Sequence, residues 1–232
     1  MLRLIRYIKP YLAQVLLTIA LLFVQANADL ALPDYLSRIV NNGIQQGGVE
    51  NAVPLAIRQS QLEKVLIFVS AEEQALITSS YTLVDQNSPD YAQYLEQYPL
   101  LAGEPVYVRM ELDQEQIDFL NPIMGRALLV VSTLEGAMAD PEKAAALSQD
   151  SPFDLSQLPP GMDLFTLLRQ LPAEQLTSMT QTINEKFSTL GDSMTEQMAV
   201  AAVKAEYEAL GMDLGKLQSD YILRTGGMML LI

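Results

Sequence analysis

Residues 11–28 read YLAQVLLTIALLFVQANA and contain no charged side chain. About 20 apolar residues in a helix are needed to cross the hydrocarbon core of a bilayer, and about 17 is the lower limit. The 18 residues of this stretch meet that limit, although only Val15–Val24 lacks a strongly polar side chain. The stretch therefore predicts an apolar helix that enters a membrane, either as a permanent anchor or as a signal sequence.

The charges on either side of this helix are strongly unequal. Residues 1–10 carry three basic side chains and no acidic one, whereas residues 44–220 carry nine basic and 26 acidic side chains, a net charge of −17. Basic flanks of a membrane helix stay on the cytoplasmic side. We therefore expect the N-terminus in the cytoplasm and the acidic block outside it. The final residues, YILRTGGMMLLI at 221–232, are mostly apolar again.

The same N-terminus also fits a secretory signal peptide. Ala26-Asn27-Ala28 in front of Asp29 has the A-x-A form of a cleavage site. On that interpretation the mature protein begins at Asp29 and is a secreted or periplasmic acidic domain. Against it, the apolar helical spacing continues beyond Ala28, and Pro33 within this continuation is tolerable as a kink. The residues that continue the spacing are Leu30, Leu32, Tyr35, Leu36, Ile39 and Val40.

The composition excludes several classes of protein. The chain has no His, Cys or Trp, so it has no zinc site of the usual ligand set, no Ser-His-Asp or Cys-His nucleophile and no disulfide. Its net charge of −14 argues against nucleic acid as a partner, because phosphates favour basic surfaces. Half of the residues are hydrophobic, which argues against disorder. We expect a folded, acidic protein.

The acidic block has the sequence pattern of a helical domain. Ser70-Ala71-Glu72-Glu73 and Ser193-Met194-Thr195-Glu196 both match the S-x-x-E capping box. Residues 106–112 instead alternate apolar and polar side chains, which is the spacing of a strand. The block is therefore predicted to be mainly α, with a short β element. Helices are predicted at 53–69, 72–83, 113–120, 122–138 and 172–190, and from Ser193 with Met194, Met198, Ala201, Ala202 and Ala205 as the apolar face.

Three groups of side chains in this block suggest binding, but each has a simpler interpretation. The acidic run at 111–118 lacks the Gly and Glu positions of a calcium loop, and Asp113 fits a helix cap. The eleven Met residues fit an adaptable binding surface, but their helical spacing favours core packing. The tyrosines either form a ligand surface or pack at turns. They are Tyr81, Tyr91, Tyr94, Tyr98 and Tyr107.

Motifs at both ends of the chain resemble a known family. Tyr7-Ile8-Lys9-Pro10 precedes the first helix, Ala28-Asp29-Leu30-Ala31-Leu32-Pro33-Asp34-Tyr35 continues it, and Ile39-Val40-Asn41-Asn42-Gly43-Ile44 ends it. Together they resemble the first transmembrane helix of bacterial ABC exporters of the heterodimeric multidrug type. Asp220-Tyr221-Ile222-Leu223-Arg224-Thr225-Gly226-Gly227-Met228-Met229-Leu230 resembles the start of the second helix of the same domain. Some members carry a large extracytoplasmic insertion between these two helices.

This resemblance implies a membrane helix pair, the second one truncated, on either side of an inserted domain. The expected division is 1–43 for the cytoplasmic start and first helix, 44–218 for the extracytoplasmic insertion, and 219–232 for the start of the second helix. The chain would be a fragment of a permease domain in the cytoplasmic membrane of a bacterium. Expected partners are the lipid bilayer, a second half-transporter and a small lipophilic substrate, with no nucleic acid. The insertion would gate the outer opening or contact the partner subunit.

Members of this family bind ATP and Mg in a nucleotide-binding domain that follows the membrane helices. The loop G-x-x-x-x-G-K-[ST], which holds nucleotide phosphates, does not occur in this sequence. As given, the chain is therefore expected not to hydrolyse ATP, and to hold no cofactor, metal or catalytic residue of its own.

Polar side chains near the end of the first helix are candidates for the substrate pathway. Ionisable groups in or near a membrane helix usually face a water-filled cavity or another helix. In an exporter these groups would line the outer part of the pathway. Alternatively, the helix has already left the hydrocarbon by Gln25, and they lie in ordinary solvent. The candidates are Gln25, Asn27, Asp29 and Asp34.

Overall fold

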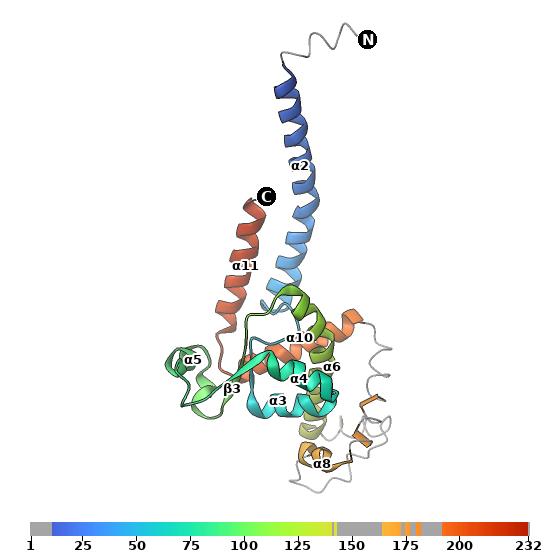
Figure 1. Ribbon diagram of the computed structural model, residues 1–232, viewed down its shortest axis with the longest axis vertical. Helices are drawn as coiled ribbons and strands as arrows, with labels where there is room; N and C mark the ends of the chain where they lie inside the picture. The colour runs from blue at the N-terminus through green and yellow to red at the C-terminus, as the bar shows by residue number, and fades with distance from the viewer. Residues whose placement is uncertain are drawn as a thin grey trace. The chain divides into compact units, whose positions relative to one another are not determined.

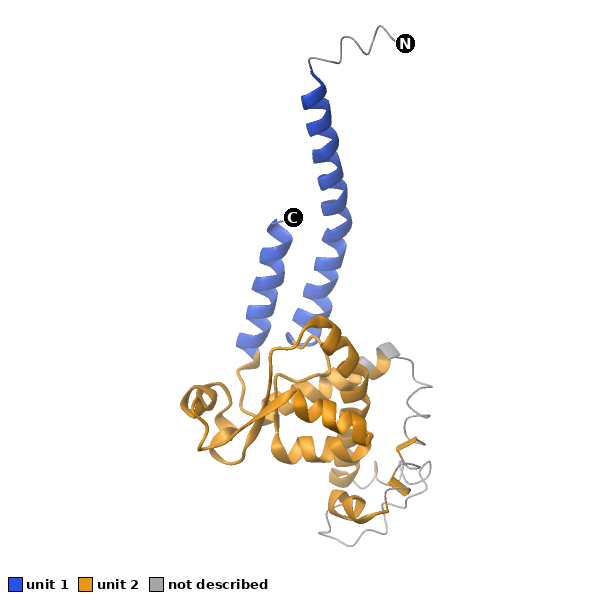
Figure 2. Ribbon diagram, viewed as in Figure 1, with its two compact units in different colours: residues 1–48, 215–232 blue, residues 49–214 orange. Residues whose placement is uncertain are grey.

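The computed structural model describes residues 11–140, 142, 164–172, 175–176, 180–181 and 192–231. These residues form helices and one small sheet (Figure 1), so the expected mainly α fold with a short β element is confirmed. The chain divides into two compact units (Figure 2). Unit 1 comprises residues 1–48 and 215–232, and unit 2 comprises residues 49–214. The boundaries expected at 43/44 and 218/219 separate membrane helices from an extracytoplasmic insertion, and this division stays a prediction.

The apolar N-terminal stretch forms α2, Leu12–Arg38, an uninterrupted helix of 27 residues. Pro33 lies inside the helix, which continues directly as the π-helix η2, Ile39–Gln45. The bond between Ala28 and Asp29 therefore lies in the middle of a helix. Gly47 and Gly48 follow with positive φ angles of 68° and 87°, a conformation that favours glycine because it has no Cβ.

The closing segment of unit 1 is also helical. α11 spans Leu214–Leu231 and begins before the predicted boundary at residue 219. It contains the charged residues Lys216, Asp220 and Arg224, while Tyr221 is buried. α11 is therefore more polar than α2, and its assignment to a membrane stays a prediction.

Unit 2 contains a three-stranded antiparallel sheet in the order β1-β3-β2. The strands are β1, Ala56–Arg58, β2, Tyr81–Val84, and β3, Val106–Arg109. Tyr107 in the central strand pairs with Ile57 on one side and with Leu83 on the other. The strand predicted at 106–112 is thus confirmed for its first four residues, and residues 110–112 lie outside it.

Short helices accompany the sheet in unit 2. Ser70 caps one of them by the expected capping box, in which the Glu73 amide donates to Ser70 Oγ at 3.3 Å and the Ser70 amide donates to Glu73 Oε2 at 2.7 Å. The Ser70 hydroxyl and the Glu73 carboxylate thus each satisfy a backbone amide that has no partner within the helix. The elements are α3, Gln59–Val65, η3, Leu66–Phe68, α4, Ala71–Ser79, α5, Tyr91–Gln97, η4, Pro99–Ala102, and α8, Leu164–Gln170.

Two longer helices form the core of unit 2. α6, Gln114–Ala139, packs against α10, Asp192–Ala209. They approach closely at Gly125, where an added Cβ would lie 3.4 Å from Ala199 Cβ and 3.3 Å from Ala52 Cβ. Asp113 caps α6 as predicted, since Asp113 Oδ1 accepts a hydrogen bond of 2.8 Å from the Gln116 amide. The buried side chains include Leu120, Ile123, Met124, Leu128, Val131, Leu134, Val200, Val203 and Leu210.

Three predicted helix boundaries in unit 2 are wrong. The helix predicted at 53–69 begins only at Gln59, because Ala56–Arg58 pairs with β3. The helix predicted at 72–83 ends at Ser79, because β2 pairs with the other side of β3. The helices predicted at 113–120 and 122–138 form the single helix α6, with Pro122 inside it. Asp118, whose carbonyl Pro122 leaves unpaired, is exposed, so water can bond to that carbonyl.

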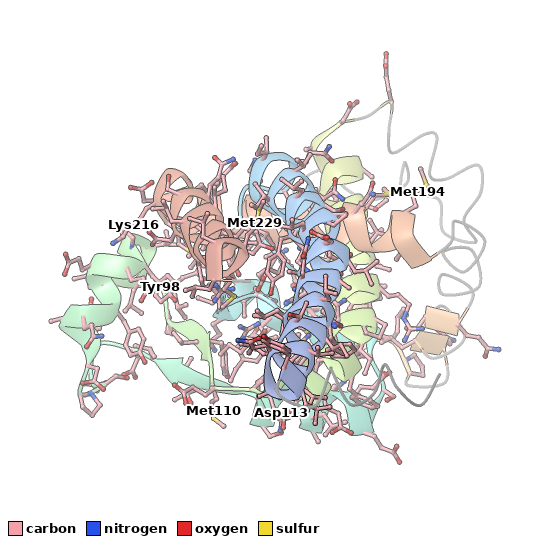
Figure 3. All side chains as sticks on the ribbon, turned by 90° about the horizontal axis from the view of Figure 1, so that it is seen from above. Tyr98, Met110, Asp113, Met194, Lys216 and Met229 are labelled. Carbon is pink, nitrogen blue, oxygen red and sulfur yellow. The ribbon has the colours of Figure 1, made fainter. Side chains whose placement is uncertain are left out.

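The apolar face predicted for the helix from Ser193 is also wrong. Met194 and Met198 are 55% and 42% exposed, and Met194 projects from the start of α10 in Figure 3. α10 instead buries a face that includes Ala199, Val200, Val203, Glu206 and Tyr207, and Leu210, directly after the helix, is also buried. Core packing was likewise predicted for most methionines, yet Met124 is buried while several others are exposed. The exposed ones are Met110, Met138, Met194, Met198 and Met228.

Two further predictions fall largely outside the described residues. They are the helix at 172–190 and the capping box between the side chains of Ser193 and Glu196. Both stay predictions.

Candidate functional site

α2 exposes apolar side chains along its whole length. None of its residues is buried, and Leu16, Leu22 and Phe23 are 58%, 59% and 71% exposed. Continuous exposed apolar surface of this kind marks contact with lipid or with another protein. The helical run Leu12–Gln45, 34 residues with a mean hydropathy of 1.9 in its most apolar window, is long and apolar enough to cross a membrane.

A second helix in the described part of the chain meets the same criteria of length and composition. α6 has a mean hydropathy of 1.3, but 56% of its apolar window is buried, against 0% for the window of α2. The apolar side chains of α6 are thus used for the core of unit 2. Criteria of length and composition are also met by a signal sequence near an N-terminus, so they do not distinguish an anchor from a cleaved leader.

The four candidate pathway residues lie on two faces of α2. Gln25 and Asp29 are four residues apart and share one face, whereas Asn27 and Asp34 are seven residues apart and share the roughly opposite face. All four side chains are exposed. Asn27 Nδ2 donates a hydrogen bond of 2.7 Å to the Phe23 carbonyl, so the helix itself partly satisfies this amide. The structure therefore brings the candidates together as two pairs.

A polar network in unit 2 holds the extended segment 51–58. The Val53 carbonyl accepts a bond of 2.7 Å from Arg109 Nη1, and the Pro54 carbonyl accepts one of 2.9 Å from Tyr81 Oη. The Leu55 amide donates to Tyr207 Oη at 2.7 Å. These partners come from β3, β2 and α10, so the segment is tied to three elements that lie far from it in the sequence.

Arg58 and Glu206 form the strongest tie in this network. Arg58 Nη2 lies 2.7 Å from Glu206 Oε2, and Arg58 Nε lies 3.0 Å from Oε1. The Glu206 side chain is only 3% exposed, whereas that of Arg58 is 27% exposed. The hydrogen bond to Glu206 raises the pKa of Arg58, against the opposing effect of burial. The pair is a structural tie with a buried carboxylate, since the half-buried guanidinium of Arg58 satisfies both oxygens of Glu206.

The five tyrosines do not form one exposed surface. Tyr81 and Tyr98 are 5% and 2% exposed, and Tyr98 (labelled in Figure 3) stacks on Tyr94 with ring centroids 6.3 Å apart. Burial, with a smaller contribution from Tyr94, raises the pKa of Tyr98 to about 12. Burial also raises the pKa of Tyr81 and that of Tyr207. Packing at turns and in the core therefore accounts for Tyr81 and Tyr98, the two buried members of the five.

A groove of about 930 Å³ lies in unit 2 between η3, α4, α6 and α8. Its apolar wall includes Phe68 and Ile123, both buried. At its edge Arg169 Nη2 lies 2.9 Å from Glu63 Oε2, and Arg126 Nη2 lies 4.0 Å from Glu73 Oε1. An apolar wall with a charged rim suits the body of a small amphipathic molecule. The other lining residues are Leu66, Ile67, Val69, Ser70, Ala71, Gln74, Leu171, Leu176, Thr180 and Gln181.

The described residues contain no cluster of three or more Asp and Glu side chains with the geometry of a metal site. In the acidic run at 111–118, Asp113 is occupied by its capping bond, and Asp118 Oδ1 accepts a bond of 2.8 Å from Gln114 Nε2. The helix-cap interpretation of Asp113 is confirmed.

Comparison with protein-family models, with curated proteins and with solved structures finds no match.

Sequence reasoning missed the residues that organise the polar contacts of both units. In unit 2 they are Arg58 and Glu206, and in unit 1 they are Gly43 and Gln218, where Gln218 Nε2 donates a bond of 2.9 Å to the Gly43 carbonyl. One signal was present: Glu206 lies three residues after Val203 and four before Leu210, on the face that α10 buries. A single acid on an apolar helical face indicates a buried partner.

Proposed function

We propose that this chain is the first part of the permease domain of an ATP-driven exporter, with α2 as a permanent transmembrane helix. The observation that carries the proposal is the unbroken helix from Leu12 to Gln45, whose apolar window contains no buried residue. An exposed apolar helix of this length is stable in lipid, because its backbone groups are bonded internally and its side chains match the hydrocarbon.

One further observation supports the anchor over a cleaved leader, and a second supports the insertion of α2 into lipid. The bond after Ala28 lies within α2, whereas a cleavage site has to be accessible as an extended segment. Polar side chains in α2 bond to their own helix, as Thr18 Oγ1 does to the Gln14 carbonyl at 2.9 Å. Such bonds lower the cost of placing hydroxyl and amide groups in hydrocarbon.

In this proposal the acidic segment 44–218 lies outside the cytoplasmic membrane of a bacterium, opposite the basic N-terminus. The substrate is a small lipophilic molecule, and a second half-transporter completes the pathway. ATP and Mg act in a domain beyond this chain, where hydrolysis drives alternating access. The insertion gates the outer opening or contacts the partner subunit, and Gln25, Asn27, Asp29 and Asp34 line the outer part of the pathway.

The groove in unit 2 supports the second candidate, a secreted binding protein whose signal peptide is removed after Ala28. Its volume of about 930 Å³ falls within the range of small-molecule sites. On this alternative the apolar helix serves export only, and binding takes place in unit 2.

The two candidates differ in the mature N-terminus. The chain is expressed in a bacterium, membranes are washed with alkaline carbonate, and the protein is analysed by N-terminal sequencing and intact mass. We expect it in the washed membranes with residues 11–28 still attached. The matched control Ala28→Leu removes the small residue that a signal peptidase requires. A wild-type chain that begins at Asp29, together with an uncut Ala28→Leu chain, would reject the exporter in favour of the secreted protein.

A further inference from the structure

The π-helix at the end of α2 approaches the N-terminal half of α11 more closely than side chains normally allow. Gly43 in η2 is buried, and an added Cβ would lie 2.8 Å from Ile222 Cγ1 and 3.4 Å from Tyr221 Cδ1. Real Cβ atoms essentially never show contacts under 3.0 Å. Glycine at position 43 is therefore what permits this approach of the backbone of η2 to α11.

A side-chain hydrogen bond joins the same two elements. Gln218 Nε2 donates to the Gly43 carbonyl at 2.9 Å and lies 3.4 Å from the Ile44 carbonyl. Gln218 precedes Ile222 by four residues, so both side chains lie on one face of α11. The last carbonyls of a helix lack partners within it, and the Gln218 amide supplies one.

A second glycine contacts α11 immediately after η2. Gly48 has a φ of 87°, and a Cβ there would lie 2.9 Å from the Leu217 carbonyl oxygen and 3.1 Å from Gln218 N. Both neighbours are backbone atoms, which cannot rotate away as the end of a side chain can. The Gly48 amide also donates to the Asn42 carbonyl at 2.8 Å, which fixes the turn.

We propose that Gly43, Gly48 and Gln218 form a clasp that holds η2 against the first turns of α11, so that the two helices move together as one hairpin. The chain leaves unit 1 after Gly48 and returns to it at Gly215. The clasp joins the segment that precedes residues 49–214 to the segment that follows them. Movements within residues 49–214 therefore cannot separate the two helices while the clasp is closed. This is a property of the chain itself and does not depend on what it transports.

Thiol cross-linking tests the closeness of the two elements. The chain contains no Cys, so an introduced pair supplies its only thiols. In the pair Gly43→Cys/Ile222→Cys, the sulfur at 222 replaces Ile222 Cγ1, so the 2.8 Å that would crowd a Cβ at 43 becomes the Cβ–S separation across a disulfide, about 3 Å. The backbone carbonyl of residue 43 still accepts the bond from Gln218. In membranes holding the full chain, mild oxidation should give a fast intramolecular disulfide, measured by gel mobility and intact mass. The control pair Gly43→Cys/Gly227→Cys should remain reduced.

Cross-linking rates in altered backgrounds test the clasp itself. Gln218→Leu removes the hydrogen bond, and Gly48→Ala forces a Cβ against the backbone of α11. Each change removes or strains a contact that holds η2 against α11, so the disulfide rate should fall about fivefold or more in each background. Gly226→Ala, at a position with no neighbour within 4 Å, should leave the rate unchanged. No disulfide in the parent pair, or equal rates in all backgrounds, would overturn the clasp.

Discussion

Glu206 binds both the backbone and the guanidinium of Arg58, although 148 residues separate the two in the chain. The Arg58 amide lies 2.8 Å from Glu206 Oε1, and Nη2 lies 2.7 Å from Oε2. One carboxylate thus accepts a hydrogen bond from the backbone amide of Arg58, the last residue of β1, and neutralises the charge of its guanidinium. Breaking a pair of this kind leaves a buried group without its partner, which costs more than forming the pair gains.

Replacing Glu206→Gln should therefore destabilise unit 2. The amide keeps the shape of the side chain but loses the charge, so we expect a loss of about 1–3 kcal/mol in the free energy of unfolding. The measurement is urea unfolding of the full chain in detergent, followed by circular dichroism. Arg169→Gln is the matched control, because the Arg169–Glu63 pair is 46% and 42% exposed and should contribute at most about 1 kcal/mol. Equal losses in the two variants would contradict the buried tie.

Gly125→Leu should disrupt the packing of α6 on α10. A Cβ at Gly125 already meets Ala199 Cβ at 3.4 Å, so a leucine side chain forces the helices apart at a cost of about 1–3 kcal/mol or more. Gly136→Ala on the same helix is the control, because nothing lies within 4 Å of its added Cβ. Alanine there should raise stability by about 0.5–1 kcal/mol. Thermal unfolding measures both, and a tolerated leucine would mean that the helices are not in close contact.

Unit 2 should lose stability at alkaline pH. Burial raises the pKa of Tyr98 to about 12, and raises those of Tyr81 and Tyr207, so all three bind protons more tightly in the folded state. Their contribution is complete below the unfolded tyrosine pKa of about 10 and is lost as the pH rises through the folded values. We expect the free energy of unfolding to fall from about pH 10 upward. Tyr81→Phe should flatten this fall, and an unchanged slope in that variant would refute the assignment.

The two faces of α2 allow a sharper test of the substrate pathway. If the chain belongs to an exporter as proposed, Gln25→Leu/Asp29→Leu in that exporter alters one face of α2, and Asn27→Leu/Asp34→Leu alters the opposite one. If one face lines the pathway, only one double variant should lose efflux of lipophilic substrates at equal membrane abundance. Unchanged efflux in both would place the four side chains in ordinary solvent, and an equal loss in both would point to a general defect in the helix.

Local signals in the sequence were reliable where the structure depends on neighbouring residues. The apolar stretch at 11–28 predicts α2 because hydropathy is a property of the stretch itself. The caps at Ser70 and Asp113 are correct because each depends on residues within one turn. The break expected before Pro122 is absent because the freed carbonyl can bond to water on the exposed face.

Signals failed where distant partners decide the structure. Ala56–Arg58 has helical spacing, but it pairs with β3 and is held by Glu206, and neither partner can be read from the local sequence. The buried face of α10 was assigned wrongly because alanine, valine and methionine lie on every side of this helix, so apolar spacing alone does not select the face with Val200, Val203 and Glu206. Glu206 and Tyr207 are buried, since Arg58 and the Leu55 amide satisfy their polar atoms. The same reasoning missed Gln218, whose partner is the carbonyl of Gly43, 175 residues earlier.

The bond between the Leu55 amide and Tyr207 Oη spans 152 residues, and this separation has a consequence for biosynthesis. A ribosome that adds about 5–20 residues per second needs roughly 8–30 s to reach the second partner after the first. During that interval β1 has neither Tyr207 nor Glu206 to hold it. The emerging polypeptide therefore passes through a stage in which an early strand is open to chaperones and proteases until nearly the whole segment has been made.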